Sequence, residues 1–396
     1  MKTVRAAIRV TLDEDLSAAR QIRVIHVSQP VDGGTAAVVE QLAAADLEKG
    51  RIVSIASPAG RLERWADANA ATWINLPLAR NPNIADLGAI HSLRKILPTV
   101  DLAYLHSSKA GAVGRLALAT LSRPRRPKSV FCPHAWSWYV GGMAAPAYRW
   151  FERIASRWVD VIIAVSRSEA ADGRACLSSK GSRKLVLIEN GVDTLGFTPE
   201  GPAADRGRDP LVVCVGRLCE QKGQDALIRA ISMLEDRTVR LCIVGDGPEL
   251  STLRRMAGTC GIAHRVEFAG PADPRPYFRA ADVVVIPSRW EGLSLVLLEA
   301  MACGATVLAT RAAAAGLPDG SGIVTAANAE PAELSRRLSG ILSNPELRNA
   351  LGHRARTTVE MDYSVMRVVG QYNDLVDGLL PITFPVAQSS FSSDPG

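Results

Sequence analysis

The segment Val283–Thr310, VVVIPSRWEGLSLVLLEAMACGATVLAT, decides the fold and carries two glutamates eight positions apart, Glu291 and Glu299. Its apolar runs predict a buried strand, a helix and a second strand, over residues 283–287, 293–303 and 306–310. Glu291 then lies at the turn from strand to helix, beside free backbone amides and the positive end of the helix dipole. Glu299 lies about two turns inside a helix that is apolar on all sides.

The spacing of these glutamates indicates a ligand site. A carboxylate buried in such a helix is costly unless it has partners, because burial strips its hydration. At ~1.5 Å per residue, Glu291 and Glu299 lie about 12 Å apart along the helix axis. That distance is close to the span from the sugar ring to the ribose in a nucleotide sugar. A buried structural ion pair is the alternative interpretation.

Further motifs occur in an order and spacing that match one protein family. They are DGGTAAVVEQLA at 32–43, HSSKAGAVGRLA at 106–117, ENGVD at 189–193, VGRLCEQKG at 215–223, IVGDGPE at 243–249 and EGLSLVLLEAMACG at 291–304. Over residues 22–380 the chain resembles the family 4 retaining glycosyltransferases of the GT-B fold. The motif at 106–117 is similar to the subgroup that builds capsular, exo- and lipid-linked polysaccharides. The resemblance implies an α/β fold of two Rossmann-like parallel-sheet domains that face each other across a cleft.

The organisation along the chain agrees with two domains, because 396 residues exceed one ordinary domain. Apolar runs separated by helical segments predict parallel strands over 22–28, 52–57, 102–105, 129–132, 161–165, 185–188, 211–215, 241–244, 266–268, 283–286 and 306–309. We expect a leader over 1–21, an acceptor-side domain over 22–200, a nucleotide-sugar domain over 201–362 and a disordered tail over 381–396. The resemblance implies that a last helix, 363–380, packs back on the first domain.

Composition limits the class of protein. The chain has no apolar run of 18 residues, and its N-terminus lacks the apolar core of a secretory signal. Its seven cysteines show no C-x-x-C motif and no paired spacing. We therefore expect reduced thiols and a cytoplasmic protein without a membrane-spanning helix.

The excess of positive charge lies in the first half of the chain. Residues 1–200 hold 26 Lys and Arg against 18 Asp and Glu, with a cluster at Arg115, Arg123, Arg125, Arg126 and Lys128. Nucleic acid is not expected as a partner, because no aromatic or helix-turn-helix pattern accompanies the charge. Attraction to an anionic membrane surface, peripheral to the inner face of the cell membrane, is one interpretation. A solvated loop is the other.

A diphosphate site is predicted directly after the strand 211–215. Gly216, Arg217 and Lys222 follow it, and two cations in one turn beside free amides suit a diphosphate. No D-x-D motif follows a strand, and Asp13-Glu14-Asp15 lies in the leader. We therefore expect no metal site, with the cations stabilising the leaving diphosphate instead. A surface ion pair with Glu220 is the alternative.

Two positions in the first domain complete the predicted site. Gly33 and Gly34 follow the first strand, where the absence of Cβ atoms lets the backbone approach a phosphate or sugar. His134 follows the strand 129–132, and the resemblance places such a histidine beside the donor sugar near the reacting carbon. A histidine of an aromatic core is the alternative for His134, whereas His26 and His106 are interpreted as structural.

The resemblance also implies the roles of the E-x(7)-E segment. Glu299 would bind the ribose hydroxyls, and Glu291 would bind the sugar together with the backbone amides of Gly292, Leu293, Ser294 and Leu295. The family usually has E-G-F-G where this chain has Glu291-Gly292-Leu293-Ser294. That departure leaves the donor sugar open.

Together these features predict a metal-independent, retaining hexosyltransferase. It would move a sugar from a nucleotide-sugar donor to a lipid-linked glycan or polysaccharide precursor, with Glu291, His134, Arg217 and Lys222 as the catalytic residues. The nucleotide sugar is a substrate, so we expect no cofactor. A soluble small-molecule acceptor, a non-catalytic nucleotide-sugar-binding protein and an epimerase are the alternatives.

Overall fold

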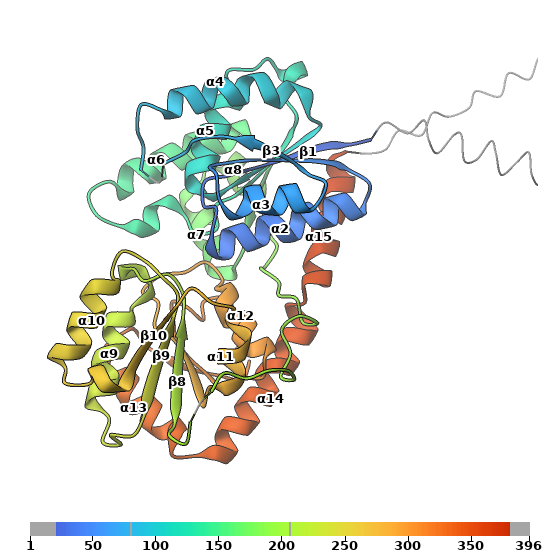
Figure 1. Cartoon of the computed structure of the whole chain (residues 1–396). Coiled ribbons are helices and arrows are strands. Elements are labelled where there is room, and N and C mark those ends of the chain that lie inside the picture. Colours follow the sequence, from blue (N-terminus) through green and yellow to red (C-terminus); the bar gives the residue numbers. More distant parts are fainter. Residues whose placement is uncertain (1–20, 80, 206, 381–396) are drawn as a thin grey trace, which may run out of the picture.

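Two parallel sheets, one above the other in Figure 1, divide the chain. The computed structural model describes residues 21–380 except 80 and 206. The expected tail, and the expected leader apart from Gln21, lie outside the described residues. The two parallel sheets with helices on their faces confirm the predicted α/β class.

The first sheet has seven strands in the order β3-β2-β1-β4-β5-β6-β7, all paired in parallel. The strands are β1 Arg23–Ser28, β2 Ile52–Ser57, β3 Thr72–Asn75, β4 Leu102–His106, β5 Lys128–Cys132, β6 Val161–Ala164 and β7 Leu185–Leu187. Its helices are α2 Gly33–Glu48, α3 Arg61–Ala68, α4 Asp86–Ile96, α5 Ser107–Ala119, α6 Ala145–Ala155, α7 Arg167–Cys176 and α8 Ser179–Ser182. Short 3-10 turns are η1 Leu97–Thr99, η2 Arg123–Arg125, η3 Ser137–Val140 and η4 Ser156–Trp158.

The second sheet has six parallel strands in the order β10-β9-β8-β11-β12-β13. The strands are β8 Leu211–Val215, β9 Arg240–Val244, β10 Val266–Gly270, β11 Val283–Ile286, β12 Val307–Thr310 and β13 Ile323–Ala326. The helices are α9 Gln224–Met233, α10 Leu250–Thr259, α11 Arg275–Ala280, α12 Leu295–Ala302, α13 Pro331–Leu342, α14 Pro345–Asp362 and α15 Val365–Leu379, with 3-10 turns η5 Glu220–Lys222 and η6 Ala263–Arg265.

The central strands form because they are apolar runs covered on both faces, as parallel sheets require. All four residues of β11 are buried, from 0% to 3% exposed. The sequence did not predict β3 and β13, which lie at sheet edges. Apart from Ala326 their side chains are partly buried or exposed, and their sequences, TWIN and IVTA, lack the long apolar run that marks a central strand.

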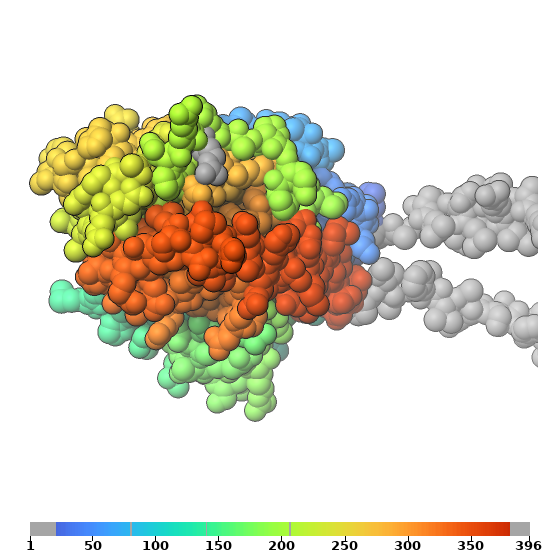
Figure 2. All heavy atoms as spheres, turned by 90° about the horizontal axis from the view of Figure 1, so that it is seen from below, coloured from blue at the N-terminus to red at the C-terminus, as the bar shows by residue number. Residues whose placement is uncertain are grey.

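The last two helices connect the domains a second time. In Figure 2 they form the orange-to-red ridge that crosses the molecule. α14 packs on α12 of the second domain, and α15 reaches α2 of the first. The ring of Tyr372 in α15 lies 6.2 Å from that of Tyr104 in β4. Val192, beyond β7, hydrogen-bonds the carbonyl of Tyr363 at 2.9 Å, so the outgoing and returning crossings are joined.

Arg115 does not belong to the basic surface that the sequence indicated. Its side chain is fully buried and forms two hydrogen bonds, of 2.5 and 2.9 Å, with the buried carboxylate of Glu152 in α6. Its guanidinium also lies 3.8 Å from the ring centroid of Phe131. Arg115 lies on the face of α5 that packs inward, so its charge is neutralised inside the domain. The other members of the cluster lie at η2 and the start of β5.

We expect Glu152→Ala to lower the free energy of unfolding by ~3–5 kcal/mol, because it leaves the Arg115 charge buried without its partner. Asp273→Ala is the control, since its pair with Arg275 is largely exposed and such pairs contribute at most about 1 kcal/mol. Urea denaturation monitored by tryptophan fluorescence measures both. Equal, small effects would contradict a structural role for the buried pair.

Candidate active site

Several predicted site residues follow the strands at the two points where strand order reverses. In open α/β sheets, ligands bind outside the carboxyl ends of the strands at such points. In the first sheet the order reverses between β1 and β4, and in the second between β8 and β11. Gly33 follows β1, Lys222 follows β8 and Glu291 follows β11. The structure therefore places all three at ligand-binding positions of their sheets.

Loops from the two domains meet here. A Cβ on Gly34 would lie 3.6 Å from the Leu295 side chain, at the start of α12. A Cβ on Gly292 would lie 3.7 Å from the backbone nitrogen of Ala135 and 3.1 Å from Val165. The side chain of Asn190 donates a 2.8 Å hydrogen bond to the carbonyl of Leu293. The E-x(7)-E segment thus lies directly against the first domain.

Lys222 and Glu291 form an ion pair at the carboxyl end of the second sheet. Burial lowers the pKa of Lys222, but the charge and hydrogen bond of Glu291 leave that pKa above its usual value. Lys222 therefore stays protonated. Lys222 lies in η5, which follows β8, and Glu291 lies in the turn after β11. The two residues meet because β8 and β11 are neighbours in the sheet.

Arg217 and Gly216 complete this part of the site. The Arg217 side chain is exposed and forms no ion pair with Glu220 or with any other residue that the structure describes. Gly216 has φ +147°, a backbone conformation that suits glycine. A Cβ on Gly216 would lie 3.7 Å from the side chain of Lys222, which packs beside it. A Cβ on Gly245 would lie 2.1 Å from the Gly216 carbonyl oxygen, so close packing accounts for the glycine in the neighbouring G-D-G turn.

Glu299 lies in the middle of α12 with a partly buried carboxylate that no residue in the described part of the chain hydrogen-bonds. Burial raises its pKa to about 7, with Arg61 and Lys222 lowering it and Asp273 raising it. Arg61 comes from α3 in the first domain, so charges of both domains act on this carboxylate. An unpartnered carboxylate of this kind is ready to accept hydrogen bonds from ligand hydroxyls.

The loop that carries His134 is held by the buried carboxylate of Glu169, whose role was not predicted from the sequence. His134 and Ala135 have φ values of +52° and +115°, which are rare for residues with a Cβ. Glu169 accepts hydrogen bonds from the backbone nitrogens of Ala135, at 2.8 Å, and Val165, at 2.7 Å. The available signal was the pattern Ser166-x-x-Glu169 at a helix start, where Ser166 caps α7.

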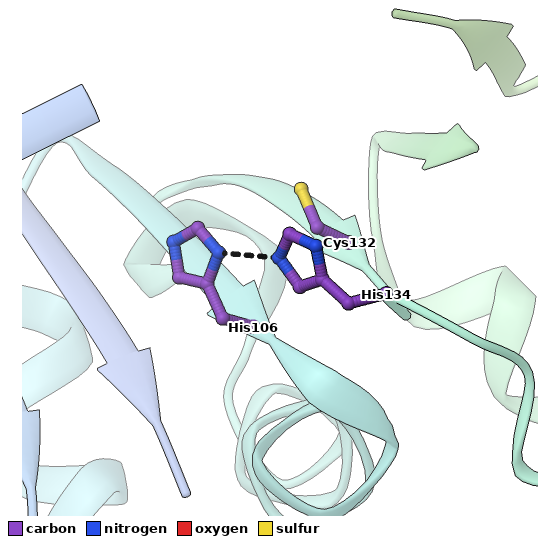
Figure 3. A group of neighbouring side chains, drawn as sticks. All are labelled: His106, Cys132 and His134. Carbon is purple, nitrogen blue, oxygen red and sulfur yellow. Dashed lines mark hydrogen bonds between the residues drawn. The ribbon is translucent and has the colours of Figure 1, made fainter. Parts of the chain in front are cut away.

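His134 also contacts a second histidine. Its Nε2 lies 3.1 Å from Nδ1 of His106 at the end of β4, as Figure 3 shows. In the described part of the chain, His106, Cys132 and His134 have side-chain atoms within 4.8 Å of one another, which is a spacing that a metal could bridge. Burial raises the pKa of Cys132 to about 12, and the ring nitrogens of His106 and His134 lie at hydrogen-bond distance from each other. The histidines are thus hydrogen-bonded partners.

The aromatic residues after His134 belong to the core. Trp136 and Trp138 are 1% and 5% exposed, and their rings stack at 4.6 Å. Trp136 donates a hydrogen bond to the carbonyl of Glu169. These side chains pack against the elements that hold the His134 loop.

Comparisons with known proteins agree with this geometry. The family model described as "Glycosyl transferases group 1" matches residues 209–344, and the model described as "Glycosyl transferase 4-like domain" matches residues 33–191. A GDP-mannose-dependent monoacylated alpha-(1-6)-phosphatidylinositol monomannoside mannosyltransferase of Corynebacterium glutamicum is 30% identical, over 64% of this chain and 71% of the relative. A GDP-mannose-dependent alpha-(1-6)-phosphatidylinositol monomannoside mannosyltransferase of Mycolicibacterium smegmatis is 35% identical, over 55% of this chain and 62% of the relative.

The mycobacterial matches span only about half to three fifths of those relatives' length. In fold, the chain is similar to HepE of Anabaena, crystallised with UDP and glucose, with a TM-score of 0.77 and 19% identity over 90% of this chain and 100% of that one. Over the described residues, no helix combines the length and the apolar character that a membrane crossing needs.

Proposed function

Because the chain belongs to the family 4 glycosyltransferases of the GT-B fold, we propose that it transfers a sugar from a nucleotide-sugar donor to a lipid-linked glycan or polysaccharide precursor. The observation that carries this proposal is the meeting of cations and carboxylates from the second sheet with Gly34 and His134 from the first. A donor bound on the second domain would present its sugar to an acceptor on the first.

The diphosphate of the donor would lie beside Lys222 and Arg217. Glu291 neutralises Lys222, and a diphosphate would take over that task while Glu291 turns to the sugar hydroxyls. Arg217 forms no ion pair with a described residue, so it is available to the diphosphate. Two cations stabilise the charge that develops as the bond from the anomeric carbon to the phosphate oxygen breaks, as a metal ion does elsewhere.

Sugar and ribose would lie along α12. Backbone amides from Gly292 to Leu295 open this helix and suit a phosphate or a sugar hydroxyl. The Ser294 hydroxyl is buried without a hydrogen-bond partner among the described residues, so it is available to the donor sugar. Glu299 would accept hydrogen bonds from the ribose hydroxyls. The spacing between Glu291 and Glu299 would then match the span from the sugar to the ribose of the donor.

We propose that the transfer retains the anomeric configuration. The leaving diphosphate and the attacking acceptor oxygen would share one face of the sugar, as the resemblance to the retaining family implies. His134 would lie beside the sugar on the acceptor side. One relative is named as GDP-mannose-dependent, and the fold neighbour HepE was crystallised with UDP-glucose, so both nucleotide sugars are the first probes.

We expect Arg217→Ala and Lys222→Ala each to lower turnover by ~10²-fold or more, because each removes a charge that stabilises the leaving diphosphate. The control is Arg229→Ala, an exposed arginine on α9, which should leave turnover unchanged. Sugar transfer to a lipid-linked acceptor from bacterial membranes measures all three, with and without EDTA. Full activity of both site variants would exclude the cation site, and loss in EDTA restored by Mg²⁺ would exclude metal independence.

The role of Glu299 predicts a pH dependence of donor affinity. With a pKa of about 7 in the free protein, the carboxylate that accepts ribose hydroxyls is lost as pH falls through that value. The Michaelis constant for the donor should therefore rise towards tenfold per pH unit below it. Glu299→Gln should raise that constant more than it lowers turnover, and should abolish its pH dependence. A wild-type constant that stays flat with pH would contradict the ribose role.

A lipid-linked acceptor requires a surface that meets the membrane. The basic turn η2 lies at the amino end of β5, whereas the cleft lies at the carboxyl ends. Helix α6 comes after the carboxyl end of β5 and exposes Arg149, Trp150 and Arg153, and Met143 is exposed in the loop before this helix. Met143 is 100% and Trp150 67% exposed. We propose that this α6 surface rests on anionic lipid, because an aromatic and two cations beside an apolar tip suit a bilayer interface.

We expect the protein to bind vesicles that contain anionic lipid and not neutral ones, with binding weakened by salt. Arg149→Ala combined with Arg153→Ala should weaken binding by about 1 kcal/mol per residue. Arg123→Ala combined with Arg125→Ala is the matched control, because these exposed arginines lie at the other end of the sheet. Vesicle flotation measures the binding. Binding that does not depend on lipid charge, or that weakens equally in both double variants, would contradict the proposal that the α6 surface binds anionic lipid.

A further inference from the structure

A continuous row of polar side chains runs through the first domain to the cleft. Nη1 of Arg51 lies 2.5 Å from Oδ1 of Asp46, and Oδ2 of Asp46 lies 3.0 Å from Nε2 of His26. Nδ1 of His26 lies 3.1 Å from Nε2 of His106, and Nδ1 of His106 lies 3.1 Å from Nε2 of His134. Every step is a hydrogen-bond distance. The row therefore joins Arg51, which follows α2, to His134 beyond the end of β5.

The sheet builds this row. β1, β4 and β5 are neighbours, with His26 paired to Tyr104 and His106 paired to Cys132 in register. These side chains share one face of the sheet, and the imidazole rings lie nearly parallel, at centroid distances of 5.4 Å. The rings of His26 and His106 are fully buried, whereas His134 is partly exposed where Gly292 approaches. A bulk-water partner is thus excluded at every step but the last.

The proton positions in this row follow from its first member. Arg51 can only donate and a carboxylate can only accept, so Asp46 must accept from Nε2 of His26. Nδ1 of His26 then accepts from Nε2 of His106, and Nδ1 of His106 accepts from Nε2 of His134. No residue that the structure describes hydrogen-bonds Nδ1 of His134. That nitrogen is left with a lone pair.

We propose that Arg51, Asp46, His26 and His106 form a relay that fixes the tautomer of His134, so that its Nδ1 accepts a hydrogen bond from a hydroxyl of the bound sugar substrate. The proposal rests on the glycosyltransferase function for the identity of that hydroxyl, but the tautomer itself does not. Asp46, His26 and His106 are positioning residues, since they act on the substrate only through His134.

The surroundings disfavour a positive charge on His106 and His134. Burial, and then His26 and His134, lower the pKa of His106 well below its usual value, and burial lowers that of His134 to about 4. Tyr104, Cys132 and Tyr372 face the row from β4, β5 and α15, and burial raises the pKa of each. Asn373 and Asp377 of α15 lie 3.4 Å from the Arg51 guanidinium. Arg51 already neutralises Asp46, so a second positive charge on a buried ring would lack compensation.

The opposite arrangement of protons is disfavoured at one point. With a proton on every Nδ1, the row would still have hydrogen bonds between its histidines. Nε2 of His26 would then direct a lone pair at the Asp46 carboxylate, and the two would repel each other. Asp46 therefore sets the direction of a row that ends three histidines away, in the manner in which a buried carboxylate orients the histidine of a catalytic triad.

The experiment measures the ring nitrogens directly. Long-range ¹⁵N–¹H spectra of the histidine side chains near neutral pH distinguish Nδ1-H from Nε2-H, and the chain has only six histidines to assign. We expect His26, His106 and His134 of the wild-type protein to be Nε2-H tautomers. A spectrum in which His134 carries its proton on Nδ1, or exchanges between the two forms, overturns the proposal whether or not transferase activity is found.

Asp46→Asn tests the consequence for the reaction. Arg51 retains the amide oxygen, so the amide NH2 faces His26 and donates to its Nε2, which reverses the row and puts the His134 proton on Nδ1. We expect turnover to fall by ~10²-fold or more, with a smaller change in the donor Michaelis constant. Asp160→Asn is the control, since Asp160 accepts from Ser129 at the amino end of the same sheet.

Each outcome decides a separate question. A reversed tautomer with wild-type turnover overturns the functional part of the proposal, and an unreversed tautomer in a folded Asp46→Asn protein overturns the relay. If Asp46→Asn does not fold, the wild-type spectrum alone decides. Absence of sugar transfer by the wild-type protein, with the expected tautomers present, would reject the proposed function and leave the relay standing.

Discussion

The site depends on a chain that crosses between its two domains twice. A single crossing after β7 would leave two sheets free to turn about one strand of backbone. The return through α14 and α15 brings Tyr372 against Tyr104 and Asp377 within 3.4 Å of Arg51. The carboxyl ends of both sheets therefore face the same space, and the outer end of the histidine row is closed by a helix from the far end of the described chain.

Electrostatics explains how the site residues are stable without a ligand's charges and can still accept a donor. Lys222 and Glu291 neutralise each other, whereas Arg217 is exposed to water and needs no partner. No residue in the described part of the chain hydrogen-bonds the Glu299 carboxylate, and its pKa of about 7 indicates that burial outweighs the nearby charges. A donor with a diphosphate and a ribose supplies what each group lacks. Affinity then arises from the replacement of internal pairs and from new hydrogen bonds to a desolvated carboxylate.

The sequence predicted much of this arrangement because its signals are local. The E-x(7)-E segment sets strand, turn and helix within 28 residues, and the central strands are apolar runs. The edge strands β3 and β13 were missed because edges are only half covered. Arg115 was misplaced because charge composition does not reveal a partner such as Glu152, 37 residues away. The row from Asp46 to His134 was missed because sheet order, and not chain order, brings β1, β4 and β5 together.

Hydrogen–deuterium exchange with GDP or UDP tests the central claim, that one cleft between the two sheets binds the donor. The account predicts that nucleotide slows exchange at residues 216–224 and 291–303, with a smaller effect at the facing loop 33–36, and leaves the outer face of α4 unchanged. Protection confined to other segments, or none with any nucleoside diphosphate that is shown to bind, would contradict it.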